Sequence, residues 1–105
     1  MATNRLDLLK QMVAQDPKNL FARYGLAMEY GNNGQLEDAI AEFETLLAND
    51  QTYTAAYYHG GQVLEKLGRL EEARGFYERG IDACNRKVDA HTRSEIEAAL
   101  SLLPI

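Results

Sequence analysis

The stretch Gly34-Gln-Leu-Glu-Asp-Ala-Ile-Ala-Glu-Phe-Glu44 returns, with a few substitutions, as Gly68-Arg-Leu-Glu-Glu-Ala-Arg-Gly-Phe-Tyr-Glu78. Between the two copies the glycine, the leucine, the pair of acidic residues, the alanine and an aromatic residue keep their places. Self-similarity at a fixed period of this length is the sequence signature of an array of stacked helical repeats. The sequence therefore predicts an all-α repeat architecture and points to a class of function without naming a partner.

Hydrophobic periodicity outside the two copies predicts further helices and no strand. Amphipathic spacing continues up to Asp16-Pro17, where the residue before proline disfavours the α conformation. Asp89 is the expected N-cap of the last helix. The expected helices cover about residues 3–15, 18–32, 36–49, 53–67, 70–84 and 89–102. Connections this short make successive helices antiparallel neighbours.

Length and composition indicate one folded domain. The chain has 105 residues, of which 46% are hydrophobic and 26% are charged, as in an ordinary globular protein. It contains no apolar run approaching about 18 residues, and the N-terminus lacks the apolar pattern of a signal peptide. We therefore expect no membrane association and a cytoplasmic location.

The charge is acidic and unevenly distributed. The net charge is −5, which argues against nucleic-acid binding because that needs a basic surface. Seven acidic residues and no lysine or arginine lie between Tyr24 and Glu65, whereas seven basic and five acidic residues lie between Lys66 and Arg93. This asymmetry is consistent with solvated helix faces of different sign, or with a charge dipole that orients a partner or a second copy of the chain.

The repeated unit resembles the tetratricopeptide repeat, a helix–turn–helix unit of about 34 residues. The resemblance implies a short right-handed superhelix, an α-solenoid, with one unit at residues 20–53 and a second at 54–87. It also implies a half-unit helix at 3–17 before them and a capping helix at 88–105 after them. Two helices of a unit can cross closely only at tiny side chains, which here are Ala27, Ala39, Gly61, Ala73 and Gly80. The aromatic residues expected to fill the wedge between helices are Tyr30, Phe43 and Tyr77.

Several positions depart from the family pattern. Arg23 stands where a large apolar residue is usual, Gly60 replaces a leucine, and Leu46 replaces a small residue. Two consecutive glycines inside a helix, Gly60 and Gly61, cost about 1 kcal/mol each relative to alanine. This cost predicts either close backbone packing or a soft spot in the fourth helix.

No arrangement typical of an enzyme or a cofactor site is visible. His59 and His91 are far apart in the sequence, and neither has a cysteine or an acid at metal-ligand spacing. Cys84 is the only cysteine, which rules out an intrachain disulfide, and no orienting group for a nucleophile accompanies it. The paired acids of the two copies stand in the first turns of helices, where they interact favourably with the helix dipole. We expect no catalytic residue, no metal and no cofactor.

The surface that remains is a groove. In tetratricopeptide arrays the first helix of each unit lines the concave face, so the resemblance implies which residues form it. The expected partner-binding groove consists of Phe21, Tyr24, Met28, Asn32, Tyr58, His59, Gln62, Lys66 and Arg93. Aromatic and methionine side chains exposed in a groove suit the apolar anchors of a partner. The alternative is that the terminal helices fold over the groove and bury these side chains in an ordinary core.

The sequence thus predicts a non-catalytic module that binds a peptide or a short amphipathic helix of another protein. Self-association through the groove or the ends of the stack is a second possibility, favoured by the opposite charge of the stretches 29–50 and 66–93. An enzyme or cofactor binder is the remote third, because it requires a polar pocket with perturbed titratable groups.

Overall fold

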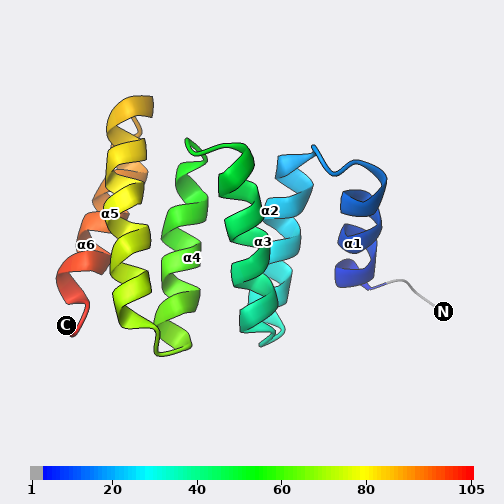
Figure 1. Ribbon diagram of the computed structural model, residues 1–105, viewed down its shortest axis with the longest axis horizontal. Coiled ribbons are helices and arrows are strands. Elements are labelled where there is room, and N and C mark those ends of the chain that lie inside the picture. Colours follow the sequence, from blue (N-terminus) through cyan, green and yellow to red (C-terminus); the bar gives the residue numbers. More distant parts are fainter. Residues whose placement is uncertain (1–3) are drawn as a thin grey trace.

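A computed structural model describes residues 4–105, which form a row of six helices connected by short turns (Figure 1). The helices are α1 (Arg5–Gln15), α2 (Leu20–Asn32), α3 (Leu36–Asn49), α4 (Thr54–Lys66), α5 (Leu70–Lys87) and α6 (Ala90–Leu102). The all-α fold expected from the sequence is confirmed. The expected start of the first helix at residue 3 lies outside the described residues. None of the helices within residues 4–105 has the length and apolar character needed to cross a membrane.

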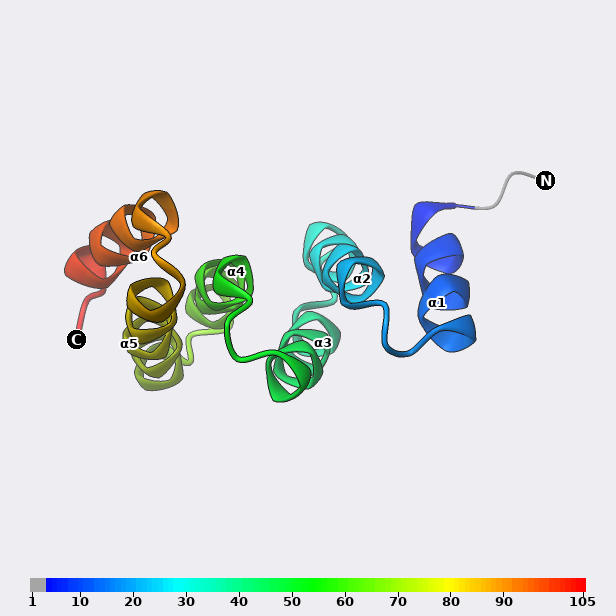
Figure 2. The same cartoon turned by 90° about the horizontal axis from the view of Figure 1, so that it is seen from above.

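The helices are arranged in two layers (Figure 2). Helices α2, α4 and α6 lie in one layer, and α3 and α5 lie in the other. Each helix packs against its neighbours in sequence, and α4 also contacts α2 and α6 within its own layer. The array measures 45 × 28 × 20 Å, so it is elongated along the row of helices (Figure 1).

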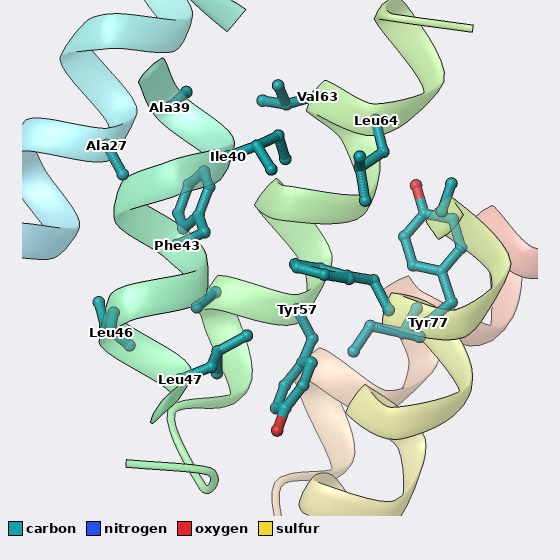
Figure 3. Close-up of a cluster of buried hydrophobic side chains, with 14 of the residues drawn as sticks. Ala27, Ala39, Ile40, Phe43, Leu46, Leu47, Tyr57, Val63, Leu64 and Tyr77 are labelled. Carbon is teal, nitrogen blue, oxygen red and sulfur yellow. The ribbon is translucent and has the colours of Figure 1, made fainter. Parts of the chain in front are cut away.

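The core lies where the helices of a pair cross, and small residues occupy the crossings. The side chains of Ala27, Ala39 and Ala73 have no exposed surface. Figure 3 shows Phe43 of α3 and Tyr57 of α4 among the buried side chains that gather between the helices. The expectation that helix pairs meet at tiny side chains is confirmed for these residues.

The consecutive glycines of α4 are sites of close packing, which resolves the alternative of a soft spot. A β-carbon at Gly60 would lie 2.5 Å from Cε2 of Phe76, and one at Gly61 would overlap the ring of Tyr77. The same holds for Gly80 of α5, where a β-carbon would lie 2.7 Å from Cβ of Tyr57. The rings of α5 therefore rest directly on the backbone of α4, which offsets the helix propensity that the glycines lose.

The end of α5 differs from the expected position. The helix continues to Lys87, about one turn beyond residue 84, and ends where Val88 adopts a left-handed conformation with φ 57°. The basic residues Arg86 and Lys87 in its last turn interact favourably with the helix dipole. Because a β-branched residue rarely takes this conformation, the sequence carries no signal for a stop at this place.

Helix α1 is held by few buried side chains. Helix α1 buries only Leu9 among its described side chains and contacts α2 through an ion pair of Arg5 with Glu29 at 3.1 Å. Tyr30 is only half-buried. It packs against the core, as expected, and the ammonium group of Lys10 lies 5.7 Å from its ring centre.

Helix α6 is anchored at both its start and its middle. The Asp89 carboxylate caps the helix by accepting a hydrogen bond from the backbone N–H of Thr92 at 3.1 Å, as predicted. It also accepts a hydrogen bond of 2.6 Å from the hydroxyl of Thr54 at the start of α4. Further along the helix, Ile96 is completely buried against Gly80.

Candidate functional site

The face formed by α1, α2 and α4 carries two hollows that share side chains. One, of about 280 Å³, lies between α2 and α4, and the other, of about 360 Å³, lies between α1 and α2. Met28 and Asn32 line both of them. Eight of the nine expected groove residues line one or both hollows, and they are Phe21, Tyr24, Met28, Asn32, Tyr58, His59, Gln62 and Lys66.

Apolar and aromatic side chains form the middle of this face. Phe21 is 79% exposed at the start of α2, whereas Tyr24, Met28 and Tyr58 are half-buried against the core. These three side chains therefore have a part that packs inside and a part that faces the hollows. Helix α1 forms one wall of the larger of the two hollows, and none of these four side chains is fully buried.

Four aromatic rings, from α2, α4 and the turn before α4, form a row in space in which each ring packs against the next. The ring centres of Tyr53 and Tyr24 are 5.4 Å apart, those of Tyr24 and His59 are 5.9 Å apart, and those of His59 and Tyr58 are 5.1 Å apart. We call Tyr53, Tyr24, His59 and Tyr58 the aromatic row. The last two contacts are edge-to-face, an arrangement that places the positive edge of one ring against the negative face of the next.

Tyr53 belongs to the aromatic row, although it was not among the expected groove residues and it lines neither hollow. It lies in the turn between α3 and α4, at the N-cap of α4, and its ring is half-buried. The helical spacing that selects groove positions does not reach a residue before the helix begins. The only signal in the sequence is an aromatic residue in a turn that is otherwise polar.

The polar residues of the face fall into two groups. The side-chain amide of Gln62 donates a 2.6 Å hydrogen bond to the hydroxyl of Tyr77, which in turn donates a 2.5 Å hydrogen bond to the Glu65 carboxylate. This donor of Gln62 is therefore engaged inside the protein. Asn32 and Lys66 are exposed at the C-terminal ends of α2 and α4. They form the polar rim of the smaller hollow.

Arg93 lies apart from the other expected groove residues. It lines a separate hollow of about 240 Å³ at the turn between α5 and α6, and its guanidinium donates a 2.7 Å hydrogen bond to the side-chain oxygen of Asn85. Helix α6 presents a different side to the core than α4 does. Ile96 is completely buried, whereas Gln62, the corresponding residue of α4, is half-buried. This orientation turns Arg93 toward α5, whereas α6 brings Glu95 within electrostatic range of Tyr24 and His59.

Burial and nearby charge alter the titration of the aromatic row. Burial raises the pKa of Tyr24, and the neighbouring Tyr53 and the Glu95 carboxylate add to this increase. Burial lowers the pKa of His59, and Glu95 partly opposes the decrease. Because the ordinary pKa of histidine is about 6.5, the His59 ring is mainly neutral at pH 7.

The groups considered for catalysis do not converge. Cys84 is buried, and burial raises the pKa of its thiol, which is the opposite of what activates a cysteine nucleophile. His59 lies in the aromatic row, whereas His91 is exposed on α6, where its Nε2 is 3.6 Å from a carboxylate oxygen of Glu95. Within residues 4–105 no three histidine, cysteine or acidic side chains are grouped so as to hold a metal ion.

The layer of α3 and α5 carries a hollow that the sequence did not indicate. It has a volume of about 490 Å³, and its walls include Leu47, Ala48, Gly75, Phe76 and Arg79. The guanidinium of Arg79 lies 5.4 Å from the ring centres of both Phe76 and Tyr57. Its charge is thus already engaged by rings of the protein itself.

Comparison with known proteins identifies a matching family and a similar protein. The family profile described as tetratricopeptide repeat matches residues 24–86. A TPR repeat-containing protein of Pseudomonas aeruginosa, PA0015, is 26% identical over 95 residues, which are 90% of either chain.

Two solved structures share the architecture as well. The solution structure of a tetratricopeptide repeat domain protein from Salinibacter ruber is 32% identical, has a TM-score of 0.79, and aligns with 85% of this chain and 90% of that one. The solution structure of protein BPP2914 from Bordetella parapertussis is 26% identical, has a TM-score of 0.84, and aligns with 97% of this chain and 89% of that one.

Proposed function

Since this chain belongs to the tetratricopeptide repeat family, we propose that it is a non-catalytic module that binds a segment of another protein across α2 and α4. The observation that carries the proposal is the pair of hollows joined at Met28 and Asn32. On this face apolar side chains lie between and within the two hollows, and the polar side chains of Asn32 and Lys66 lie at one rim. This distribution resembles the anatomy of protein interfaces, where an apolar centre is surrounded by a polar rim.

The proposed mechanism is the burial of a few apolar anchors on a preformed surface. Tyr24, Met28 and Tyr58 are held by the core, so little conformational entropy is lost when a partner covers them. Phe21 is 79% exposed and is the side chain with the most apolar surface left to bury. We expect an extended peptide or one face of an amphipathic helix to lie in this groove. We expect an affinity of about micromolar order because only a few anchors are available.

Site-specific photo-crosslinking in the source cell tests the proposal. A benzoylphenylalanine in place of Phe21 keeps an aromatic ring at an exposed position and is expected to capture a discrete partner. The matched control carries the same group at Glu78, which is exposed on α5 in the opposite layer. Capture at position 21 that is lost when Met28→Glu is added supports the proposal. Equal capture at both positions, or none at position 21, contradicts it. Fractionation of the same cells checks the expected cytoplasmic location.

Self-association is the second candidate, and exposed apolar side chains at both ends of the array favour it. Leu8 and Met12 of α1 are 51% and 39% exposed, and Leu102 and Ile105 near the other end are 81% and 53% exposed. Contacts between unlike ends would give an open chain of copies. Sedimentation over a range of concentrations decides between the two: a mass that stays monomeric at high micromolar concentration eliminates self-association, and a rising mass that Met12→Glu and Leu102→Glu suppress would establish it.

A further inference from the structure

The hollow between α2 and α4 has one charged residue in its wall, and that residue is basic. Lys66 lines this hollow, and within residues 4–105 its ammonium group forms no ion pair. The hollow between α1 and α2 differs, because Arg5 and Glu29 in its wall are paired at 3.1 Å. The charges that line the two hollows, two positive and one negative, therefore sum to +1, whereas the whole chain has a net charge of −5.

The acidic residues on the adjoining parts of α4 and α6 do not offset the charge of Lys66. Glu65 and Glu95 line neither hollow. The Glu65 carboxylate accepts a hydrogen bond from the hydroxyl of Tyr77, and a carboxylate oxygen of Glu95 lies 3.6 Å from Nε2 of His91. Lys66 is thus the charged group that a ligand in this hollow encounters.

A second hydrogen-bond donor lies on the neighbouring helix at the same level. Asn32 and Lys66 are the last residues of α2 and α4, and they occupy the same position of the two repeats. The two helices belong to one layer (Figure 2), and both side chains are exposed and line the hollow between them. An ammonium group and a side-chain amide placed in this way offer N–H donors that a carboxylate accepts.

The C-terminal ends of α2 and α4 lie at this rim, and their turns engage part of the helix carbonyls. The N–H of Gln35 donates a 2.9 Å hydrogen bond to the carbonyl of Tyr30, and the N–H of Arg69 donates one of 2.9 Å to the carbonyl of Leu64. Carbonyls of this kind carry the partial negative charge of a helix end, and a hydrogen bond satisfies them. An anion at the rim therefore meets an ammonium group and few free carbonyls.

We propose that the segment bound across α2 and α4 presents an acidic side chain, aspartate or glutamate, to Lys66 and Asn32. This inference rests on the proposed function and adds the charge of the partner residue that lies at the polar rim. A basic side chain there would be repelled by Lys66, and an apolar one would cover the ammonium group without pairing it. Asn32 lines both hollows, so a segment that covers both passes it with a side chain and not with its chain end.

The inference is tested with three short peptides that differ only in the central side chain. N-acetyl-Leu-Glu-Leu-amide, its glutamine analogue and its lysine analogue have no terminal charge. Each is titrated into the isotopically labelled protein at pH 7, and the NMR shifts of the Asn32 amide and the Met28 methyl group are followed. We expect the glutamate peptide to bind about threefold more tightly than the glutamine peptide and about tenfold more tightly than the lysine peptide, as one exposed ion pair allows.

Matched variants locate the site. Lys66→Gln should remove the preference for glutamate over glutamine, whereas Lys87→Gln removes the same charge from an exposed position of α5 in the opposite layer and should keep the preference. Asn32→Asp places a carboxylate beside Lys66 and should make the glutamate peptide the weaker ligand. Asn33→Asp is its control, because the neighbouring Asn33 lines neither hollow.

Four results would overturn the inference. Equal binding of the three peptides would mean that the rim does not read charge, and tighter binding of the lysine peptide would mean that it reads the opposite charge. If Lys87→Gln removes the preference as fully as Lys66→Gln does, only the net charge of the protein acts. If the glutamine peptide with a free C-terminal carboxylate binds as tightly as the capped glutamate peptide, the rim takes a chain end. None of these results alters the capture of a partner by position 21, so failure of this inference is distinguishable from failure of the proposed function.

Discussion

The helix pairs α2–α3 and α4–α5 are corresponding units of the repeat but are held together by different chemistry. In the first pair, the guanidinium of Arg23 lies 2.6 Å from a carboxylate oxygen of Glu42, and these side chains are only 12% and 22% exposed. The corresponding residues of the second pair are Tyr57 and Phe76, which pack edge-to-face with ring centres 6.2 Å apart. A half-buried ion pair in one pair of helices is thus replaced by an aromatic pair in the other.

The neighbouring residues compensate for this change in volume. Leu26, which is 3% exposed, corresponds to Gly60, and the ring of Phe76 occupies the space above that glycine. Likewise Ala27 and Phe43 correspond to Gly61 and Tyr77. The comparison teaches that a crossing of two helices needs a constant total volume and not a constant residue type, as is found for repacked protein cores.

The largest effect is expected from Gly61→Ala. This change gives the second helix pair the alanine of the first pair, but it keeps the larger Tyr77 where the first pair has Phe43. The new methyl group would overlap the ring of Tyr77, whose hydroxyl is fixed by hydrogen bonds with Gln62 and Glu65. We expect a loss of about 3 kcal/mol in the free energy of unfolding, measured by urea denaturation. Tyr77→Phe added to Gly61→Ala frees the ring to move and should recover part of the loss. An unchanged stability would show that α5 does not rest on the backbone of α4.

The next effect concerns the ion pair of the first helix pair. Glu42→Ala leaves the guanidinium of Arg23 mostly buried without its carboxylate, and we expect a loss of about 2 kcal/mol. The triple variant Arg23→Tyr, Leu26→Gly and Glu42→Phe transfers the chemistry of the second pair to the first.

We expect the triple variant to unfold within about 1 kcal/mol of the parent, because buried ion pairs contribute little net stability compared with well-packed apolar groups. Thermal and urea unfolding of both proteins checks the expectation. A triple variant that is less stable than Glu42→Ala would show that the two pairs do not share one geometry.

A smaller effect is expected at the contact between α4 and α6, which has no polar counterpart between α2 and α4. The residues one repeat before Thr54 and Asp89 are Leu20 and Ala55. Hydrogen bonds from Thr54 and Thr92 lower the pKa of the Asp89 carboxyl in the folded protein. The stabilisation is therefore fully present above the ordinary aspartate pKa of about 3.9 and is lost as the pH falls through the lower folded value.

Thr54→Val removes the bond to Asp89 and should cost about 1 kcal/mol at pH 7. The difference in unfolding free energy between the variant and the parent should shrink below about pH 4. Its persistence at full size at pH 2 would mean that the carboxylate is not the group stabilised by Thr54.

The smallest effect is an increase in stability from Gly75→Ala. Gly75 lies inside α5, a β-carbon there would meet nothing within 4 Å, and the corresponding residue of α3 is the exposed Ala41. We expect a gain of about 0.7 kcal/mol, because alanine is the better helix former and restricts the unfolded chain. Gly61→Ala serves as the opposite control, and a destabilised Gly75→Ala would indicate that the side of α5 facing the hollow is not open.

The period that separates Gly34 from Gly68 was sufficient to predict the fold, because the contacts that define a repeat are local in sequence. It also placed eight of the nine expected groove residues on one face. The prediction failed for Arg93, because α6 buries Ile96 instead of continuing the pattern of the preceding helices. It failed for Tyr53 because a turn residue is positioned by tertiary contacts, here with Tyr24, that no helical period encodes.

The central claim is that recognition belongs to the α2–α4 face and not to the opposite layer. Peptides selected from a random display library against the protein provide a ligand, and binding to matched variants measures where it sits. Met28→Glu places a charge between the two hollows of the recognition face, and Ala48→Glu places the same charge in the hollow between α3 and α5. The account predicts that Met28→Glu weakens the selected peptides at least about tenfold and that Ala48→Glu leaves them unchanged. Peptides that lose affinity only with Ala48→Glu would contradict it.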